Sequence, residues 1–303
     1  MRRLSVLAGV YRRLPTEQSN AASRRIDVKS VSEILQIMRR EDAKVPRAVA
    51  RESPRIERAV KLISGCLASG GRLFFVGAGT SGRLGVIEAA ECPPTFGTKP
   101  SQIQAIMAGG RGAVFRSKEG AEDDLAAGAR ELRRLARRGD VVVGIAASGV
   151  TPFVRGALAA ARESKARTVL VTSNARSRVP EAELVIALRV GPEIISGSTR
   201  MKAATAAKLV LNTLTAASMI RLGKVYDGWM VDLRPSSYKL RQRALRLLCL
   251  LGRVSPARAQ RILKSSGGSV KTGIVMAHKR VPASEARRRL RSSSGSLRRV
   301  LEA

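Results

Sequence analysis

Short apolar runs alternate with amphipathic stretches through the middle of the chain. The runs are rich in Val, Ile and Leu with little polar alternation, as is typical of strands buried on both faces of a parallel sheet. The predicted strands are Arg72–Val76, Ile103–Met107, Val141–Ala146, Thr168–Thr172 and Leu184–Leu188. Helical patterns such as Gly120–Arg138 and Thr151–Lys165 lie between them. These repeated units predict an α/β fold, a doubly wound and mainly parallel five-stranded sheet with right-handed crossovers.

Helical patterns also flank this region on both sides. Apolar positions recur every three or four residues from Val31 to about Ser69, with Pro46 and Pro54 marking breaks or helix starts. A long Ala-, Leu- and Met-rich helix is predicted from Ser198 to Leu222. After Ser236 the chain predicts small helices at 239–252, 256–265, 269–279 and 283–291, with a flexible connector at 292–296. We therefore predict an N-terminal leader and helical arm (1–50), an α/β domain (51–235) and a small C-terminal helical domain (236–303).

The net charge of +33 raises the question of a polyanionic partner, such as nucleic acid or an anionic membrane. The basic residues are spread over the whole length and are not gathered into one arm. Aromatic residues that could stack on bases make up only 3% of the chain, and no recognition motif accompanies the charge. The pattern favours a solvated basic surface, and we expect no specific nucleic-acid partner.

The N-terminus and the cysteines favour a cytoplasmic protein. The apolar run near the N-terminus is short for a secretory signal and is followed at once by Arg12-Arg13. No stretch approaches the roughly 20 apolar residues of a membrane span, so no membrane partner is expected. The three cysteines are widely spaced, and His278 is the single histidine. We therefore expect neither a disulfide framework nor a zinc site.

A glycine-rich loop, Gly77-Ala-Gly79-Thr80-Ser81-Gly82, follows the first predicted strand and opens a helix. Backbone N–H groups at a helix start form an anion site, and glycines allow the ligand a close approach. The spacing also matches the dinucleotide fingerprint, which requires an acidic residue after the second strand. That strand is followed by Ala108-Gly-Gly110, without a carboxylate. The hydroxyls of Thr80 and Ser81 favour a phosphate monoester.

A second loop of this kind, Ser148-Gly149-Val150-Thr151-Pro152, follows the third predicted strand. Taken singly, each loop is more typical of an N-cap, a common role of Ser and Thr. Loops at the carboxyl ends of parallel strands can also converge on one ligand at the topological switch point. The two loops together predict a binding site for a phosphorylated small molecule.

Four glutamates near these loops are candidates for catalysis: Glu88, Glu91, Glu119 and Glu122. Acidic residues are scarce, with 23 Asp and Glu in the chain, so their clustering here is informative. A pair of carboxyl groups can act as general acid and general base. Asp123 and Asp124 are more typical of a helix N-terminus. Spacing alone does not choose among the four glutamates.

Several motifs resemble the N-acetylmuramic acid 6-phosphate etherase family. The string Glu-Cys-Pro-Pro-Thr-Phe-Gly at 91–97 is the most specific of them. The other matching stretches are Gly77–Gly85, Glu119–Glu122, Ala147–Gly149, Gly191–Glu193, Gly197–Ala203 and Gly223–Tyr226, with Thr16-Glu17 and Ile26-Asp27 before them. The resemblance covers the chain from about Leu14 to its C-terminus. It implies a sugar-isomerase-domain, flavodoxin-like fold.

The resemblance also implies an activity, namely cleavage of the D-lactyl ether of N-acetylmuramic acid 6-phosphate by elimination and hydration. The products are N-acetylglucosamine 6-phosphate and D-lactate, in amino sugar and cell-wall recycling. The implied enzyme is a homodimeric carbon–oxygen lyase without metal or organic cofactor. Glu91 corresponds to the acid that protonates the departing lactate oxygen, and Glu122 to the second catalytic carboxylate. The implied substrate- and phosphate-binding residues are Gly79, Thr80, Ser81, Ser148, Gly149, Thr151, Ser198, Thr199 and Lys202.

Some positions depart from the family pattern. Val150, Ala204, Ala207 and Ser237 stand where the family has Arg, Gly, Gln and Asn. The alternative function is a non-catalytic sugar-phosphate-binding regulator of the same fold, similar to the glucokinase regulatory proteins. Those proteins are longer and carry a second sugar-isomerase-type domain, whereas this chain has one pair of phosphate loops. A sugar-phosphate aldose–ketose isomerase fits the fold but not the Glu-Cys-Pro-Pro string.

Overall fold

The computed structural model describes residues 14–303, and the predicted leader at residues 1–13 lies outside them. The chain forms two compact units. The first comprises the described residues through Glu88 together with Ile103–Leu214, and the second comprises Ala89–Gln102 and Thr215–Ala303. The division falls within two long helices, α5 (Gly79–Phe96) and α8 (Lys202–Arg221). The predicted domain boundaries after residues 50 and 235 stay predictions.

A five-stranded parallel sheet forms the centre of the first unit. Its strands are β1 (Leu73–Gly77), β2 (Ile103–Met107), β3 (Val141–Ile145), β4 (Arg167–Thr172) and β5 (Leu184–Ala187). The order is β2-β1-β3-β4-β5, and all neighbours are parallel. This confirms the predicted doubly wound α/β fold, because every residue of β1 and β3 is buried, as the apolar runs indicated. Strand β2 lies on one side of β1, and β3, β4 and β5 follow on the other side. The topological switch point therefore lies between β1 and β3.

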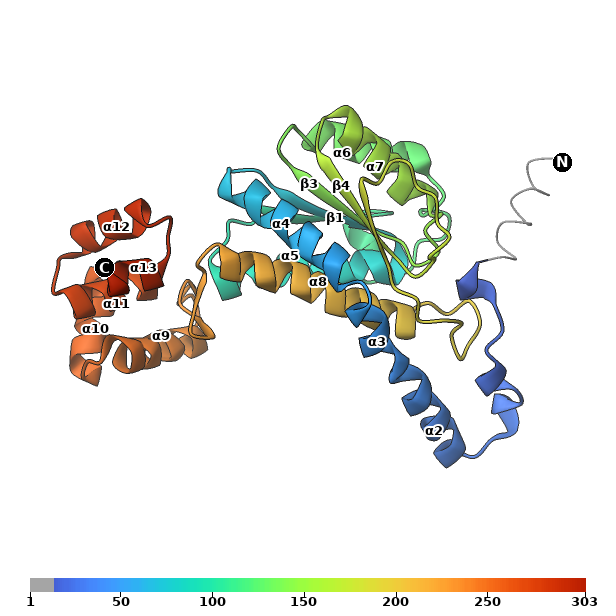
Figure 1. Cartoon of the computed structure of the whole chain (residues 1–303), viewed down its shortest axis with the longest axis horizontal. Coiled ribbons are helices and arrows are strands. Elements are labelled where there is room, and N and C mark those ends of the chain that lie inside the picture. Colours follow the sequence, from blue (N-terminus) through green and yellow to red (C-terminus); the bar gives the residue numbers. More distant parts are fainter. Residues whose placement is uncertain (1–13) are drawn as a thin grey trace. The chain divides into compact units, whose positions relative to one another are not determined.

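Helices cover both faces of this sheet. Figure 1 shows α6 (Leu125–Leu135) and α7 (Pro152–Glu163) on one face and α4 (Ser53–Ala68) on the other. The α6 and α7 helices bury Leu132 and Leu158 against Phe74 and Val142 of the strands. The remaining elements are the 3₁₀ turns η1 (Pro15–Glu17), η2 (Ala21–Ser23), η3 (Ile26–Val28) and η4 (Arg111–Val114), with α2 (Val31–Asp42) and α3 (Lys44–Ala50).

Two helices begin later than the sequence predicted. The α6 helix begins at Leu125 rather than Gly120, because the Asp124 side chain caps it by accepting from the Ala127 N–H at 2.8 Å. The α8 helix begins at Lys202 rather than Ser198, where the buried Glu193 carboxylate accepts the N–H groups of Lys202 and Ala203 at 3.1 and 2.8 Å. Both shifts leave residues of interest in the loops that precede the helices.

The α8 helix is long and apolar enough to span a membrane by length and composition. This corrects the expectation that no stretch of the chain approaches that limit. Half of its apolar window is buried inside the protein. The charged Lys202 at its start is buried in the same way.

The second unit contains a short hairpin and a helical core. The hairpin joins β6 (Val225–Tyr226) to β7 (Trp229–Met230). The helices are α9 (Tyr238–Gly252), α10 (Pro256–Ser265), α11 (Val270–Lys279), α12 (Ala283–Ser292) and α13 (Leu297–Glu302). The predicted flexible connector at 292–296 is instead a hydrogen-bonded turn, in which the Gly295 N–H donates to the Leu290 carbonyl at 2.7 Å. The hairpin and α13 were not predicted.

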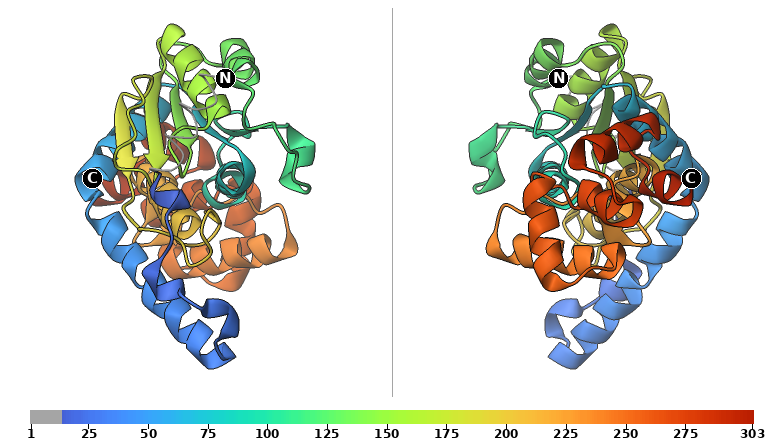
Figure 2. Two further views of the ribbon diagram at one scale, coloured as in Figure 1. Left: turned by 90° about the vertical axis from the view of Figure 1, so that its right-hand side faces the viewer. Right: turned by 90° about the vertical axis from the view of Figure 1, so that its left-hand side faces the viewer.

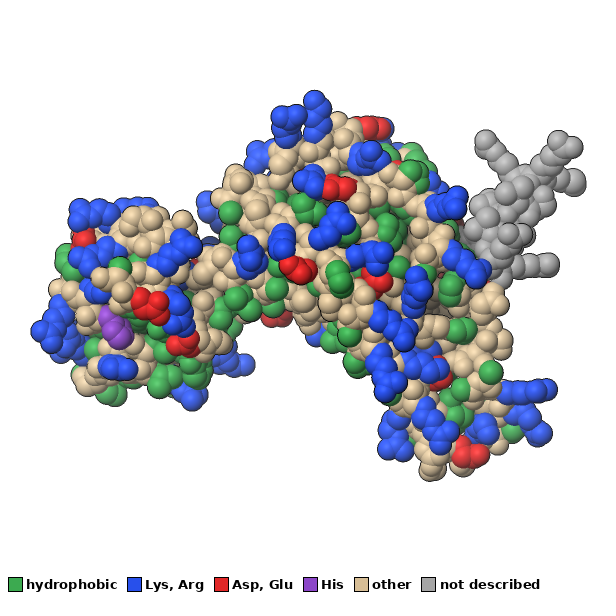
Figure 3. All heavy atoms as spheres, in the orientation of Figure 1, with side chains coloured by type: hydrophobic (Ala, Val, Ile, Leu, Met, Phe, Trp, Pro, Cys, Tyr) green, Lys and Arg blue, Asp and Glu red, His purple; other side chains and the backbone are tan. Residues whose placement is uncertain are grey.

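Basic side chains are spread across the face of the molecule drawn in Figure 3, over both units. Acidic side chains are interspersed among them in smaller number. The view matches the even distribution of Lys and Arg along the sequence, and it shows no single basic patch on this face.

Candidate active site

A cavity of about 220 Å³ lies at the carboxyl ends of β1 and β3. Its lining includes Thr80 and Ser81 from the first predicted phosphate loop and Ser148 and Thr151 from the second. The other lining residues are Thr16, Glu17, Ala78, Gly79, Glu122, Asp123, Ile145, Ala146, Ala147, Pro152, Gly197 and Thr199. All of them belong to the first unit. The two loops therefore meet at the topological switch point.

Two helix N-termini point their favourable dipole ends at this cavity. Gly79 begins α5, and Pro152 begins α7. Thr151 occupies the N-cap position of α7, but its side chain makes no capping hydrogen bond. Its hydroxyl is thus not committed to the cap, which was the competing interpretation of these loops. Because no Lys or Arg is among the described residues that line the cavity, an anion there would be held by hydroxyls, amides and helix dipoles.

In both loops a glycine allows the backbone to approach neighbouring atoms closely. A Cβ on Gly82 would lie 2.7 Å from the Gly77 carbonyl oxygen, so α5 can start directly against the end of β1 only with glycine there. Gly149 has φ +73°, and a Cβ on it would lie 2.3 Å from Ser177 Oγ. It does not line the cavity, so its evident role is to shape the second loop.

The end of β4 and the segment after it hold the second loop in place. Thr172 Oγ1 donates to the Ala147 carbonyl at 3.1 Å, and Asn174 Nδ2 donates to the Ser148 carbonyl at 2.9 Å. Ser177 Oγ donates to the Gly149 carbonyl at 3.0 Å. The sequence analysis did not identify these supporting residues. Their polar side chains at the end of the fourth strand and just after it were the available signal.

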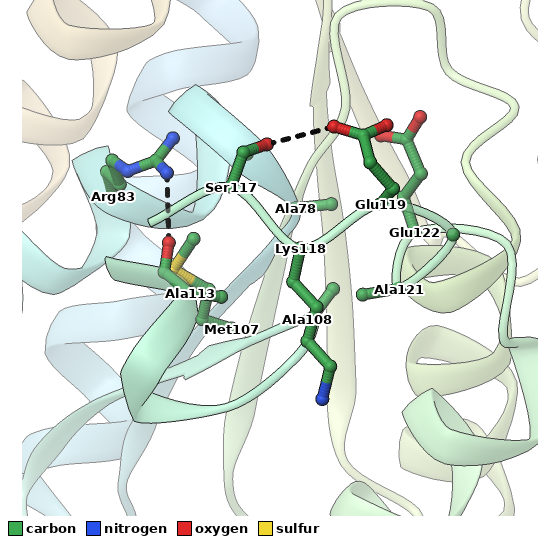
Figure 4. Close-up of a pocket in the computed structure, with 12 residues that line it drawn as sticks. Ala78, Arg83, Met107, Ala108, Ala113, Ser117, Lys118, Glu119, Ala121 and Glu122 are labelled. Atoms are coloured by element: carbon green, nitrogen blue, oxygen red, sulfur yellow. Dashed lines mark hydrogen bonds between the residues drawn. The ribbon is translucent and has the colours of Figure 1, made fainter. Parts of the chain in front are cut away.

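The structure separates the four candidate glutamates. Glu88 is buried and accepts a hydrogen bond from Asn212, so its surroundings are those of a structural residue. Glu122 is exposed to the cavity of the phosphate loops. Glu119 lies beside it in Figure 4, in an adjoining cavity of about 240 Å³, with Ser117 Oγ 3.4 Å from its Oε1. Glu119 and Glu122 both lie in the loop before α6, because that helix begins after them.

The adjoining cavity shares Ala78, Gly79 and Glu122 with the first. Arg83 of α5 lines it and donates to the Ala113 carbonyl oxygen at 2.9 Å (Figure 4) and to the Val114 carbonyl oxygen at 2.7 Å. The guanidinium thus ties η4 to α5. Glu122 stands where the two cavities meet, so a ligand that fills either cavity lies beside its carboxylate.

Besides Gly149, three predicted residues lie outside the lining of this cavity. Glu91 has an exposed side chain on α5 and belongs to the second unit. Ser198 is half-buried and does not line the cavity, whereas its neighbour Thr199 does. Lys202 is only 1% exposed, and its Nζ lies 2.5 Å from Glu41 Oε2 and 2.7 Å from the Pro192 carbonyl oxygen. Its ammonium is thus engaged within the protein.

Glu41 is the centre of this buried polar cluster. Besides Lys202, it pairs with Lys44 at 2.5 Å and accepts from Asn20 Nδ2 at 2.9 Å. Burial raises the pKa of the Glu41 carboxyl, but the hydrogen bonds from Lys202, Lys44 and Asn20 outweigh it and lower the pKa to about 2. The cluster joins α2, α8 and the N-terminal segment. It therefore fixes the position of the start of α8, which follows the loop that contains Thr199.

The cavity also contains residues that the sequence did not predict as part of the site, among them Asp123, which was expected at a helix N-terminus. Thr16 and Glu17 come from η1, and Asp123 follows Glu122. Thr16 and Glu17 were noted only as part of a matching stretch, which was the available signal. Within residues 14–303, no group of three or more His, Cys, Asp or Glu side chains is arranged to hold a metal ion.

One family model and a solved structure resemble parts of the chain. Residues 55–162 match the family model of the glucokinase regulatory protein N-terminal SIS domain. The phosphoheptose isomerase of Neisseria gonorrhoeae is a structural neighbour at 16% identity and a TM-score of 0.49, over 62% of this chain and 98% of that one.

Relatives in sequence match nearly the whole chain. The N-acetylmuramic acid 6-phosphate etherase of Salinibacter ruber is 50% identical over 95% of this chain and 94% of its own length. The protein of the same name from Geobacillus thermodenitrificans is 44% identical over 95% of this chain and 99% of its own length. Since such identity extends over almost the full length of each protein, the chain belongs to the N-acetylmuramic acid 6-phosphate etherase family.

Proposed function

We propose that this protein is a carbon–oxygen lyase that cleaves the D-lactyl ether of N-acetylmuramic acid 6-phosphate. The products are N-acetylglucosamine 6-phosphate and D-lactate. The observation that carries this proposal is the convergence of two hydroxyl-bearing loops and Glu122 on one cavity, in a chain 50% identical to a named etherase. The substrate, a phosphosugar, would arise in the recycling of cell-wall amino sugars, and we place the enzyme in the cytoplasm.

The proposed reaction proceeds by elimination followed by hydration. In the open-chain sugar, the C1 aldehyde makes the C2 proton acidic, so a carboxylate can remove it. The C2–H electron pair forms the C2=C3 double bond, and the C3–O bond breaks with its electron pair on the lactate oxygen. An acid protonates that oxygen, and D-lactate leaves. Water then adds to C3 and a proton returns to C2, so no oxidant, reductant or cofactor is consumed.

The residues take the following roles in this proposal. Glu91 is the acid for the lactate oxygen, and Glu122 is the second catalytic carboxylate. The hydroxyls of Thr80, Ser81, Ser148 and Thr151 hold the 6-phosphate, with the amides at the start of α5. The position of Glu122 supports this assignment of roles, because Glu122 shares one cavity with all four hydroxyls.

A D-lactate assay tests the activity. We expect the purified protein to release D-lactate from N-acetylmuramic acid 6-phosphate, and the sugar product made in ¹⁸O-labelled water should carry the label at C3. A simple hydrolysis at the lactyl carbon would place the label in lactate instead and would contradict the elimination. Tight phosphosugar binding without lactate release would favour the non-catalytic regulator.

We further propose that the protein is a homodimer that uses α2. Four apolar residues of this helix, Val31, Ile34, Leu35 and Met38, are spaced to form one stripe. Val31 and Leu35 are nevertheless 73% and 53% exposed. The blue segment that contains α2 projects from the sheet in both views of Figure 2. A second copy of the chain would supply the missing partner for this stripe.

The dimer proposal is tested by sedimentation equilibrium. We expect the wild-type protein to sediment with twice the mass of one chain. The double variant Val31→Ser/Leu35→Ser should shift toward the single-chain mass, since it replaces the two most exposed residues of the stripe. Leu250→Ser, which changes a comparably exposed leucine on α9, is the matched control and should stay dimeric. A wild-type protein with the mass of one chain would refute the proposal.

A further inference from the structure

The geometry points to Glu17 as a substrate-binding carboxylate that accepts a hydrogen bond from a hydroxyl or amide N–H of the sugar. This inference rests on the proposed function, because it takes a sugar phosphate as the ligand. Glu17 lines the cavity of the phosphate loops together with Glu122. Together with its neighbour Thr16 it comes from the N-terminal segment, far in sequence from the other cavity residues.

The backbone on both sides of Glu17 is anchored. Leu14, Thr16 and Asn20 are all buried, whereas Glu17 itself is exposed to the cavity. The Thr16 carbonyl accepts from the Gly197 N–H at 3.0 Å, which joins η1 to the loop before α8. Asn20 Nδ2 donates to the Pro192 carbonyl at 2.9 Å. The segment Leu14–Asn20 therefore acts as a fixed strap that carries one carboxylate to the cavity.

The carboxylate is oriented but retains a free acceptor. Thr16 Oγ1 donates to Glu17 Oε1 at 3.0 Å, which sets the position of the side chain. Among residues 14–303, no Lys or Arg forms an ion pair with Glu17, so no basic side chain of this part of the chain neutralises its negative charge. Gly197 has φ +79°, and a Cβ there would lie 3.4 Å from Glu17 Oε2. Glycine at this position thus leaves room beside the second oxygen.

The chemistry of the cavity fits a ligand with two different ends. The hydroxyls and the helix starts offer donors, which suit a phosphate dianion. Glu17, Glu122 and Asp123 are the charged residues of the lining, and all three are acceptors. A carboxylate repels phosphate but accepts hydrogen bonds from sugar hydroxyls and from an acetamido N–H. Glu17 is therefore suited to the body of the sugar and not to its phosphate.

Two ligands test binding of the sugar and binding of the phosphate separately, and neither measurement requires turnover. We would measure dissociation constants of N-acetylglucosamine 6-phosphate and of inorganic phosphate by calorimetry. Glu17→Gln should weaken binding of the sugar phosphate about tenfold or more, the effect of losing a hydrogen bond to a charged group. It should leave phosphate binding unchanged or tighter. Glu17→Asp, which keeps the charge but shortens the side chain, should also weaken the sugar phosphate selectively.

A matched control and two further outcomes complete the test. Glu163→Gln removes one charge from an exposed ion pair with Arg133 and should change neither dissociation constant. Equal weakening of both ligands in Glu17→Gln, or no change in either, would overturn the assignment while leaving the proposed function intact. If the wild-type protein binds neither probe, the assignment and the proposed function fail together. In the etherase assay, Glu17→Gln should raise KM more than it lowers kcat.

Discussion

Glu122→Gln and Glu91→Gln are each expected to lower kcat for D-lactate release by about 10²–10⁴-fold, the usual contribution of a general acid or base. Glutamine has nearly the size of glutamate, but its amide cannot act as a general acid or a general base. Binding of N-acetylglucosamine 6-phosphate should stay within a few-fold, because the proposed phosphate ligands Thr80, Ser81 and Ser148 are unchanged. Initial rates and calorimetry on the same preparations give both quantities.

Glu119→Gln is the informative comparison for this prediction. Glu119 lies beside Glu122 in Figure 4 but does not line the cavity of the phosphate loops. We expect its replacement to lower kcat much less than that of Glu122. A larger loss in Glu119→Gln than in Glu122→Gln would show that the second catalytic carboxylate has been assigned to the wrong glutamate.

Lys202→Met is expected to destabilise the protein by about 3–5 kcal/mol, because it leaves Glu41 charged and buried without its main partner. Lys44→Met is the matched control, since it removes the exposed partner of the same carboxylate and should cost about 0–1 kcal/mol. Urea unfolding measures both. If Lys202→Met abolishes phosphosugar binding without destabilising the fold, Lys202 contacts the substrate as the family resemblance implies.

The same cluster predicts a contribution to acid stability. The pKa of Glu41 is lowered from 4.5 to about 2 in the folded protein, so its ionised form stabilises the fold above pH 4.5. That stabilisation is lost as the pH falls from about 5 to 2, and it amounts to on the order of 3 kcal/mol. The free energy of unfolding of Glu41→Gln should therefore fall less steeply over this range. A slope equal to that of the wild type would contradict the assignment.

The sequence by itself determined the strands, the order of elements and the two phosphate loops. Each of these depends on a local pattern. The apolar runs of β1 and β3 are continuous because both faces of those strands are buried, and Gly82 and Gly149 stand where a Cβ would collide with nearby atoms. The family motifs are also contiguous strings. A reader of the sequence can therefore predict that both loops end at one edge of the sheet.

Only the tertiary structure decided which side chains share the cavity. Glu88 and Glu122 have the same side-chain chemistry and both follow the first phosphate loop in the chain, yet one is buried beside Asn212 and the other faces the phosphate loops. The motif around Lys202 predicts a substrate contact, but the Lys202 ammonium forms an ion pair with Glu41 of α2. Glu17 reaches the cavity through a strap held by Gly197. These outcomes depend on contacts between residues far apart in the chain, and no local pattern of residues encodes such contacts.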